Sequence, residues 1–300
     1  MKKIIITLLA TVLTFQLQSQ EPPQKKVDAM KVISYNIWNG FDWGKDLTRR
    51  DQLIAWIASQ KPDVVALQEL CGYTRQKLLE DAKGWGHNYA EILKNSGYPV
   101  GITSNKPIKI QEKILEDLHH GALHCRTWDI DFMVVHFSPF SYKKRREETR
   151  IVLDKLSQVA KSRDKYIVLG DFNAVSPFDA DLYRGNESLL TSMRASEKEH
   201  GHVRNLFQGQ LEYGVLSTFL GFPLLDVTQI YTSGLEARLT SPTRIFNRQI
   251  KNDKNPNAKR IDYILVSPHL QTTSINARVL NGKETFYLSD HYPVMAEFGL

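Results

Sequence analysis

The stretch YIVLGDFNAVSP, residues 166–177, decides the fold prediction, because an apolar segment here ends in two polar side chains instead of one. Residues 166–169 are apolar and rich in β-branched and aromatic types, which predicts a buried strand. Gly170 and one Asx residue would complete an ordinary turn. The sequence has both Asp171 and Asn173, separated by Phe172. The second polar residue exceeds what a turn needs and indicates a chemical role.

Predicted strands and helices alternate along residues 31–298. Strands are expected at 31–37, 63–70, 98–110 (two strands broken by a turn at 105–107), 121–139 (a hairpin), 166–171, 260–267, 272–280 and 291–298. Helices are expected over 47–60, from 143 to about 161, and in parts of 178–223. The strands are too many for one doubly wound sheet. We therefore predict a mixed α/β (α+β) protein of two packed sheets with helices outside.

The first twenty residues, MKKIIITLLATVLTFQLQSQ, have the pattern of a secretory signal peptide. Lys2 and Lys3 precede a short apolar run, and polar residues with Ser19 follow it. The run is too short for a membrane span, so no transmembrane segment is expected in the mature chain. We expect a periplasmic or secreted protein with one domain over residues 28–300, because no repeat or linker divides the chain. Removing Lys2 and Lys3 lowers the formal net charge from +6 to +4, a modest surplus that is compatible with anionic partners without being diagnostic of nucleic acid.

Two cysteines, Cys71 and Cys125, lie in the mature chain. Export brings them into oxidising conditions, where a disulfide can form if their separation allows it. Two separate buried thiols fit the sequence equally well.

Several predicted strands carry polar residues suited to chemistry at or near an end: Asn36, Glu69, His136, Asp171 with Asn173, Asp262, and Asp290 with His291. Each alone has a structural explanation, such as a turn cap, a surface ion pair or a core histidine. If these segments converge, four carboxylates meet and one would be forced to take up a proton. A divalent cation removes that conflict. Oxygens from Asn36, Glu69 and Asp290 suit a hard cation such as Mg²⁺, with Mn²⁺ or Ca²⁺ as alternatives.

The histidines of HHGALH, residues 119–124, are the nearest approach to a zinc-type cluster. They have no accompanying thiolate and alternate awkwardly along a strand. We interpret His119, His120 and His124 as structural or peripheral.

With GDFN (170–173), RIDYIL (260–265) and SDHYPV (289–294) in this order, the chain resembles the endonuclease/exonuclease/phosphatase superfamily over about residues 31–298. This superfamily includes deoxyribonuclease I, exonuclease III-like abasic endonucleases, neutral sphingomyelinases and inositol polyphosphate 5-phosphatases. YPVGITSNKPI, residues 98–108, also resembles the family's inner strand pair. The resemblance implies a four-layer α/β/β/α sandwich of the deoxyribonuclease I type, which agrees with two packed sheets.

The resemblance also implies a role for each matching position. Asn36 and Glu69 would hold the metal, with Asp290 close to it. Asp171 would orient or deprotonate the attacking water, and Asn173 would steady this water and a phosphoryl oxygen.

The histidines would contact the phosphate. His291 would sit against it, held in its tautomer by Asp262, and His136 would be a second donor. Deoxyribonuclease I, sphingomyelinases and inositol phosphatases carry His at this last position, whereas the exonuclease III-like branch has Tyr. Export and His136 therefore both disfavour an abasic-site endonuclease.

We expect an exported, metal-dependent phosphoesterase that hydrolyses a phosphodiester by in-line attack of an activated water. A fixed metal and fixed donors would stabilise the charge that develops on the phosphoryl and leaving oxygens. The alternatives are a secreted DNA or RNA endonuclease and a sphingomyelinase-like phospholipid headgroup phosphodiesterase; phosphorylated small molecules also fit. An inactive phosphate-binding module is disfavoured because all eight positions are intact. No stable protein partner is implied.

Three segments are expected to frame the substrate pocket. Residues 36–46 carry Trp38, Phe41 and Trp43, of which we expect at least two to pack against the sheet edge. Residues 143–146 are interpreted as the solvated face of a helix start. The basic segment 243–263 suits contact with a polyanion and contains Arg244, Arg248, Lys251, Lys254, Lys259 and Arg260.

Overall fold

The structure is a computed structural model that describes residues 29–234, 236–245, 255 and 257–299. The predicted signal peptide lies outside the described residues, and so do Arg248, Lys251 and Lys254 of the basic segment. No helix in the described ranges is both long enough and apolar enough to cross a membrane.

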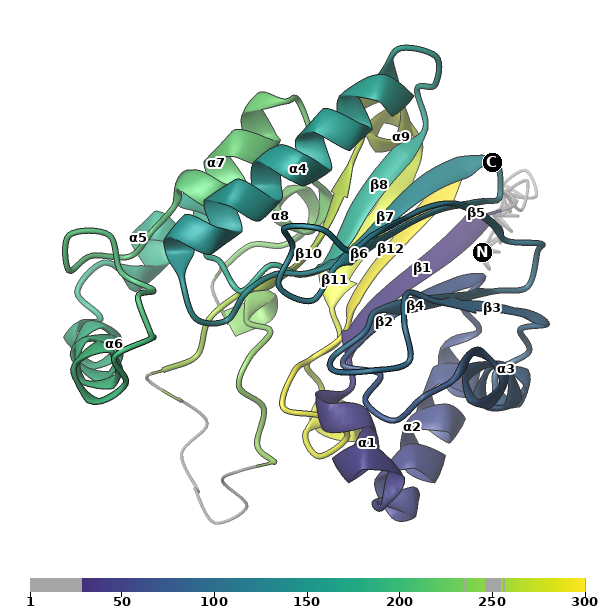
Figure 1. The fold of residues 1–300 in the computed structure, drawn as a ribbon, viewed down its shortest axis with the longest axis horizontal. Coiled ribbons are helices and arrows are strands. Elements are labelled where there is room, and N and C mark those ends of the chain that lie inside the picture. The colour runs from purple at the N-terminus through teal and green to yellow at the C-terminus, as the bar shows by residue number, and fades with distance from the viewer. Residues whose placement is uncertain (1–28, 235, 246–254, 256, 300) are drawn as a thin grey trace, which may run out of the picture.

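Within the described residues, twelve strands form two mixed six-stranded sheets (Figure 1). The first has the order β11 (Ser274–Val279), β12 (Val294–Gly299), β1 (Ala29–Asn36), β2 (Val64–Gln68), β4 (Gly101–Ser104) and β3 (Tyr89–Ile92). The second has the order β5 (Lys109–Ile114), β6 (Ala122–Thr127), β7 (Ile130–His136), β8 (Tyr166–Asp171), β10 (Asp262–Val266) and β9 (Leu225–Asp226).

Helices cover the outer faces of both sheets (Figure 1). On the first sheet lie α2 (Leu47–Gln60) and α3 (Arg75–Gly84); on the second lie α4 (Tyr142–Ala160) and α7 (Gly214–Gly221). The remaining helices are α1 (Trp38–Gly44), α5 (Ala180–Tyr183), α6 (Glu187–Glu199), α8 (Val227–Tyr231) and α9 (Pro268–Thr273), with 3-10 turns at Pro177–Asp179, Glu236–Arg238 and Lys283–Thr285. The four-layer α/β/β/α sandwich is confirmed.

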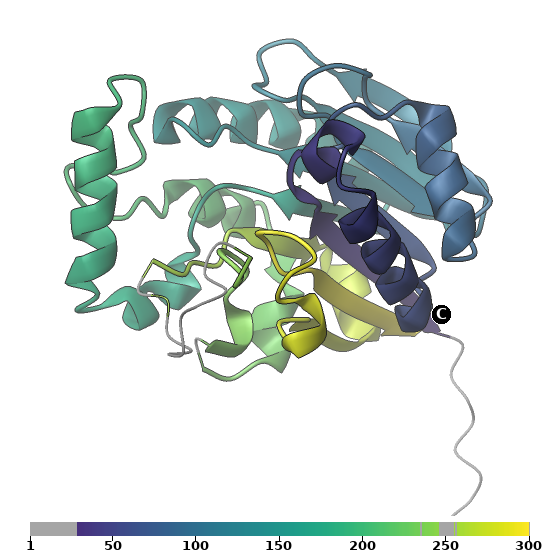
Figure 2. The ribbon, with the colours of Figure 1, turned by 90° about the horizontal axis from the view of Figure 1, so that it is seen from below.

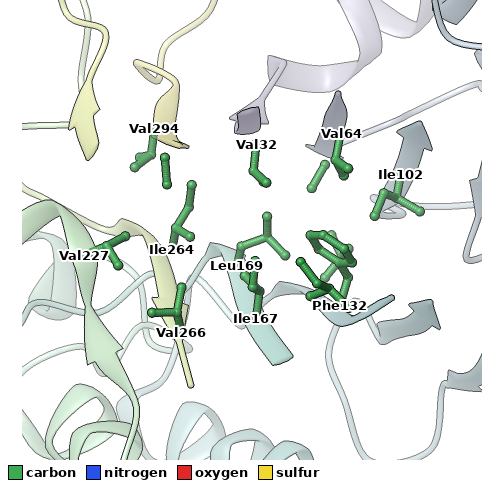
Figure 3. Close-up of a cluster of buried hydrophobic side chains, with 14 of the residues drawn as sticks. Val32, Val64, Ile102, Phe132, Ile167, Leu169, Val227, Ile264, Val266 and Val294 are labelled. Atoms are coloured by element: carbon green, nitrogen blue, oxygen red, sulfur yellow. The ribbon is translucent and has the colours of Figure 1, made fainter. Parts of the chain in front are cut away.

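Side chains alternate between the two faces of a strand, so each sheet can pack one face against the other sheet and the opposite face against helices. Along β1, Met30 and Val32 face the layer between the sheets, whereas Ile33 and Tyr35 face the helices. Figure 3 shows the inner layer, where side chains of the two sheets meet. Each fully buried aliphatic side chain contributes about 1.5–3 kcal/mol, so this inner layer fixes how the sheets face each other.

Strand register places the polar strand ends at one edge of the sandwich. β1 runs parallel to β2, and β7 runs parallel to β8, so the C-terminal ends of each pair lie side by side. Asp171 is opposite His136 in β7 and opposite Asp262 in β10. Gly170, with φ of +139°, permits this close approach, because a Cβ there would lie 2.0 Å from the Val135 carbonyl oxygen.

One expectation needs revision. The strands within residues 98–110 exist, but they are not a pair: β4 joins β2 and β3 in the first sheet, whereas β5 joins β6 in the second. The intervening turn therefore connects the two sheets. Of the two alternatives for Cys71 and Cys125, the structure has two separate buried thiols.

Candidate active site

The eight predicted residues meet at the edge defined by the strand register. Asn36 joins the two sheets directly, because its Nδ2 donates to Glu69 Oε1 and to Asp171 Oδ2, each at 3.1 Å. Ser289 Oγ donates to the Asn36 carbonyl oxygen at 2.6 Å, which brings the adjacent Asp290 to the same place. The separate strand ends thus form one site.

His291 lies between two carboxylates. Its Nδ1 is 2.8 Å from Asp262 Oδ2, and its Nε2 is 3.9 Å from Asp171 Oδ2. Burial lowers the pKa of His291, but the charges of Asp262, Asp290 and Asp171 together raise it well above its ordinary value. The neighbouring carboxylates therefore favour the protonated ring, whose Nε2 lies on the side of Asp171.

Asp171 occupies that centre. Burial, followed by the charge of Asp262, raises the pKa of Asp171 to about 7. Its Oδ1 accepts from the Asn173 backbone N–H at 2.8 Å, and Asn173 Nδ2 donates to the Phe137 carbonyl oxygen at 3.0 Å. The Asx turn that could explain the opening motif is therefore present, while Asp171 Oδ2 faces the other site residues. A carboxyl group that titrates near neutrality suits a general base.

His136 forms the third side of the centre. Its Nε2 is 3.6 Å from Asp171 Oδ2, and its ring stacks on that of His120 with centroids 4.2 Å apart. Burial, with the charge of His291, lowers the pKa of His136 to about 3. The ring is therefore neutral and can donate a hydrogen bond without carrying charge.

Glu69 and Asn36 are held by a left-handed turn that the sequence did not predict. Residues 38–43 of α1 all have φ between +51° and +63°, which is unfavourable for non-glycine residues. Two of its backbone amides are used: Asn39 N–H donates to Glu69 Oε2 at 2.7 Å, and Trp38 N–H donates to Asn36 Oδ1 at 3.0 Å. Backbone strain is thus concentrated beside two proposed metal ligands.

Arg49 supports this turn and was missed in the sequence. Its buried guanidinium donates to three carbonyl oxygens, those of Ile37 at 2.7 Å, Trp38 at 2.9 Å and Leu288 at 3.1 Å. Figure 2 shows the segment before β12 beside α1 and α2, where this contact is made. A signal was available, because Arg49 shares the apolar face of its helix with Leu53.

The segments expected to frame the pocket differ in how far the structure agrees with the prediction. Arg260 is fully buried and pairs with Asp179 and Asp226, so the expectation that it contacts a polyanion is wrong. Arg145 is buried too, and donates to the Ser138 carbonyl oxygen at 2.8 Å rather than facing solvent.

The aromatic segment behaves as expected. Phe41 is buried and Trp38 is half-buried with the Arg49 guanidinium 5.0 Å from its ring centre, whereas Trp43 is 49% exposed. Two of the three rings therefore pack against the protein.

The HHGALH histidines divide into two groups. His124 is structural, with Nε2 2.9 Å from Asp131 Oδ1. His120 lies against His136, and His119 lies against His120 with ring centroids 4.4 Å apart. The interpretation of His119 and His120 as structural or peripheral therefore needs revision, because both adjoin the site.

The residues present fit a divalent cation. Neither Glu69 nor Asp290 forms an ion pair with Lys or Arg in the described part of the chain. Burial raises the pKa of Asp290; the charge of His291 opposes this shift and the charge of Glu69 adds to it. Two carboxylates and an amide oxygen, with neither carboxylate paired to Lys or Arg, form a donor set suited to a hard cation.

A second group of candidate ligands is Asp171, Asp262 and His291, whose ligand atoms all lie within 4.8 Å of one another. The structure thus has a possible acidic/His metal site here as well. In this group His291 Nδ1 is already bonded to Asp262, which suits a positioned proton donor.

The chain belongs to the Endonuclease/Exonuclease/phosphatase family, whose model matches residues 33–291. This finding confirms the resemblance that the three motifs indicated. No curated protein matches the sequence.

Solved structures share the fold. An AP endonuclease from Archaeoglobus fulgidus is 18% identical with a TM-score of 0.65, covering 90% of this chain and 100% of that one. A Neisseria 3′ phosphatase, NExo, bound to a product DNA hairpin is 23% identical with a TM-score of 0.64, at coverages of 90% and 100%. TDP2 from D. rerio, with a single-strand DNA product, is 18% identical with a TM-score of 0.56, at coverages of 91% and 100%. At these identities the likeness shows the fold alone.

Proposed function

We propose that the protein hydrolyses a phosphodiester with the help of a divalent cation, Mg²⁺ being the best match to its oxygen ligands. One observation carries the proposal: Asp171 Oδ2 accepts from Asn36 Nδ2 at 3.1 Å and lies 3.6 Å and 3.9 Å from Nε2 of His136 and His291. A base thus faces an amide and two imidazoles at one point. This set of groups suits attack by water on a phosphoryl centre.

In this mechanism, Asp171 takes the proton of the attacking water and Asn173 orients that water. The His291 imidazolium, fixed by Asp262, stabilises charge on a phosphoryl oxygen, and neutral His136 donates a hydrogen bond to another. These donors are positioned before the reaction, so little reorganisation is needed as charge develops.

Asn36, Glu69 and Asp290 would hold the cation. When bound, it would neutralise charge on a phosphoryl oxygen and on the leaving group. Mn²⁺ and Ca²⁺ use the same class of ligands and are the alternatives to test.

The structural neighbours support a nucleic-acid phosphoester as the first substrate to test, because two of them are described with DNA products. A phospholipid headgroup phosphodiester and a phosphorylated small molecule are the other candidates. The N-terminal pattern supports a periplasmic or secreted protein.

Hydrolysis of bis(p-nitrophenyl) phosphate tests the proposal directly. Mature protein should release p-nitrophenol with Mg²⁺, Mn²⁺ or Ca²⁺ and stop when EDTA is added. Asp171→Asn and His291→Ala should each lower kcat at least about 10²-fold, the usual contribution of a general acid or base.

Matched controls are Asp154→Asn, on the exposed side of α4, and His269→Ala, a half-exposed histidine paired with Asp164. Both should leave turnover unchanged. Turnover that survives in Asp171→Asn, or that ignores EDTA, would overturn the proposal. Phosphate binding without product release would instead support an inactive binding module.

A further inference from the structure

An open row of aromatic rings begins at the catalytic centre. From His136 the row continues to His120, then to Tyr98 with ring centroids 5.4 Å apart, and to Trp43 a further 6.0 Å away. Tyr98 is 36% exposed and Trp43 is 49% exposed, so the row leads from a buried catalytic residue to solvent.

A second branch leaves the same point. The His119 ring lies 5.4 Å from Phe140, and Phe140 lies 5.0 Å from His202. His119, Phe140 and His202 are all exposed. We call the residues Trp43, Tyr98, His119, His120 and Phe140 the aromatic rim.

The aromatic rim is built into the fold rather than being a chance arrangement of loose side chains. Glu148 of α4 is completely buried, and its carboxylate accepts from His119 N–H at 2.7 Å and Ser138 N–H at 2.9 Å. One carboxylate thus fixes the loop that carries His119 and His120 against the segment that follows β7. His119, His120 and Phe140 are therefore held relative to His136.

Positive charge accompanies these rings. Lys94 and Lys144 both lie close enough to His119 to lower its pKa, although burial is the larger cause. Lys94 forms no ion pair within the described residues. The imidazoles themselves are uncharged: burial and the nearby His136 lower the pKa of His120 to about 2. The surface thus combines flat neutral rings with separate cations.

We propose that the aromatic rim binds a single-stranded nucleic acid whose scissile phosphodiester lies at Asp171; this inference rests on the proposed function. Exposed rings offer stacking faces to successive bases, and lysines beside them meet the backbone phosphates. An acyl chain would gain nothing from the lysines and would have to displace water from the exposed His119 imidazole. The combination of rings and charges therefore favours a nucleic-acid strand over a lipid.

Binding is measured separately from catalysis. The probe is fluorescein-labelled (dT)10, titrated with Asp171→Asn protein in Mg²⁺ and followed by fluorescence anisotropy. Tyr98→Ala and Phe140→Ala, each added to Asp171→Asn, should weaken binding about tenfold, as expected for the loss of one stacked base. Lys94→Ala should reduce the slope of log K against log salt by about 0.7, the value for one phosphate of a single strand.

Tyr89→Ala is the matched control. Tyr89 is another exposed tyrosine, 38% accessible. It pairs with Ser104, and Ser104 pairs with the first residue of β2. Glu69, in contrast, follows the last residue of β2. It therefore lies at the far end of the sheet and should not alter the affinity.

Three results would overturn the proposal: no binding of (dT)10 at low salt, equal affinity in the rim variants, or a blue shift of tryptophan fluorescence with sphingomyelin or phosphatidylglycerol vesicles that Trp43→Ala abolishes. Hydrolysis of bis(p-nitrophenyl) phosphate by the unmodified enzyme is measured separately and could still occur with any of these results. If that hydrolysis is absent, the proposed function fails on its own measurement.

Discussion

Asp262 acts on the proposed reaction through His291. Its Oδ2 is 2.8 Å from His291 Nδ1, and its charge is the leading factor that keeps the buried imidazole protonated. Replacing Asp262 by Asn removes this charge and leaves a buried amide next to the ring. We expect Asp262→Asn to lower kcat about 10²–10³-fold while KM changes little, because the loss concerns charge that develops during the reaction.

The test of this coupling is a double-mutant cycle. Because Asp262 works through His291, the Asp262→Asn/His291→Ala protein should be no slower than His291→Ala alone. Additive losses in kcat would show that Asp262 has a separate role, and circular dichroism would reveal any variant that has lost its fold.

At this scale the sequence indicated the chemically active groups but not those that hold them. Asn36, Asp171 and His291 could be selected because a carboxylate, amide or imidazole at a strand end is a local pattern. Arg49 binds carbonyl groups 12 and 239 positions away, a geometry that exists only after folding. The functions of these residues remain predictions.

The left-handed turn of α1 depends on one glycine. Gly40 has φ of +54°, and a Cβ there would lie 2.1 Å from the Cys71 carbonyl oxygen. Gly40→Ala therefore combines a left-handed alanine, costing about 1–2 kcal/mol, with an overlap that costs about 1–3 kcal/mol more. We expect the free energy of unfolding in urea to fall by about 2–5 kcal/mol and Mg²⁺ affinity to fall with it, because Asn39 N–H no longer holds Glu69.

Gly86→Ala separates the two contributions. Gly86 has φ of +90°, and nothing lies within 4 Å of the position its Cβ would take. This variant should lose only the backbone term of about 1–2 kcal/mol and should bind Mg²⁺ normally. Equal losses of unfolding free energy in both variants would mean that the overlap with the Cys71 carbonyl oxygen adds nothing to the cost of Gly40→Ala.

His87, which follows α3, should make the stability of the protein depend on pH. Its Nε2 bonds the Pro62 carbonyl oxygen at 2.9 Å, so Nδ1 must accept from Thr103 Oγ1 and Trp85 Nε1. If Nδ1 were protonated, its N–H would face the Trp85 Nε1–H, and neither group could accept a hydrogen bond from the other. Burial lowers the pKa of His87, so between that lowered pKa and about 6.5 the unfolded chain binds a proton that the folded chain does not.

Stability should therefore fall as pH falls below about 6.5, by up to about 1.4 kcal/mol per pH unit from this one group. Urea unfolding of the wild-type protein and His87→Gln between pH 7.5 and 5 measures the contribution. His87→Gln should be less stable at pH 7.5 but show a smaller slope. An identical slope would place the acid sensitivity elsewhere, with His119, His120 and His136 as the next groups to replace.

For the whole molecule, counting strands was enough to predict two packed sheets, because one sheet could not hold so many. The assignment of each strand was less certain. β4 and β5 follow each other closely, and their separation into different sheets depends on the partners β2 and β6. The left-handed α1 was not predictable, since its strain is tolerated only where Arg49 and the strand ends surround it.

Removing one charge from the proposed metal site should stabilise the protein without metal and weaken its response to added metal. Glu69 lies close enough to Asp290 for its charge to raise the pKa of Asp290, although burial of Asp290 is the larger cause. Glu69→Gln removes this repulsion and keeps one oxygen to accept from Asn39 N–H, at the loss of the hydrogen bond that Asn36 Nδ2 donates to Glu69 Oε1. We expect its melting temperature without metal to equal or exceed that of the wild-type protein.

The response to magnesium should show the opposite order. Mg²⁺ at a hundred times its Kd should stabilise the wild-type protein by about 2.7 kcal/mol and Glu69→Gln by much less. Asp51→Asn, an exposed carboxylate on α2, is the control and should respond as the wild type does. A full magnesium response in Glu69→Gln would show that the cation does not need Glu69, with Asp171, Asp262 and Asp290 as the remaining carboxylates of the site. The balance between metal-free stability and metal affinity therefore tests where the cation binds without any measurement of turnover.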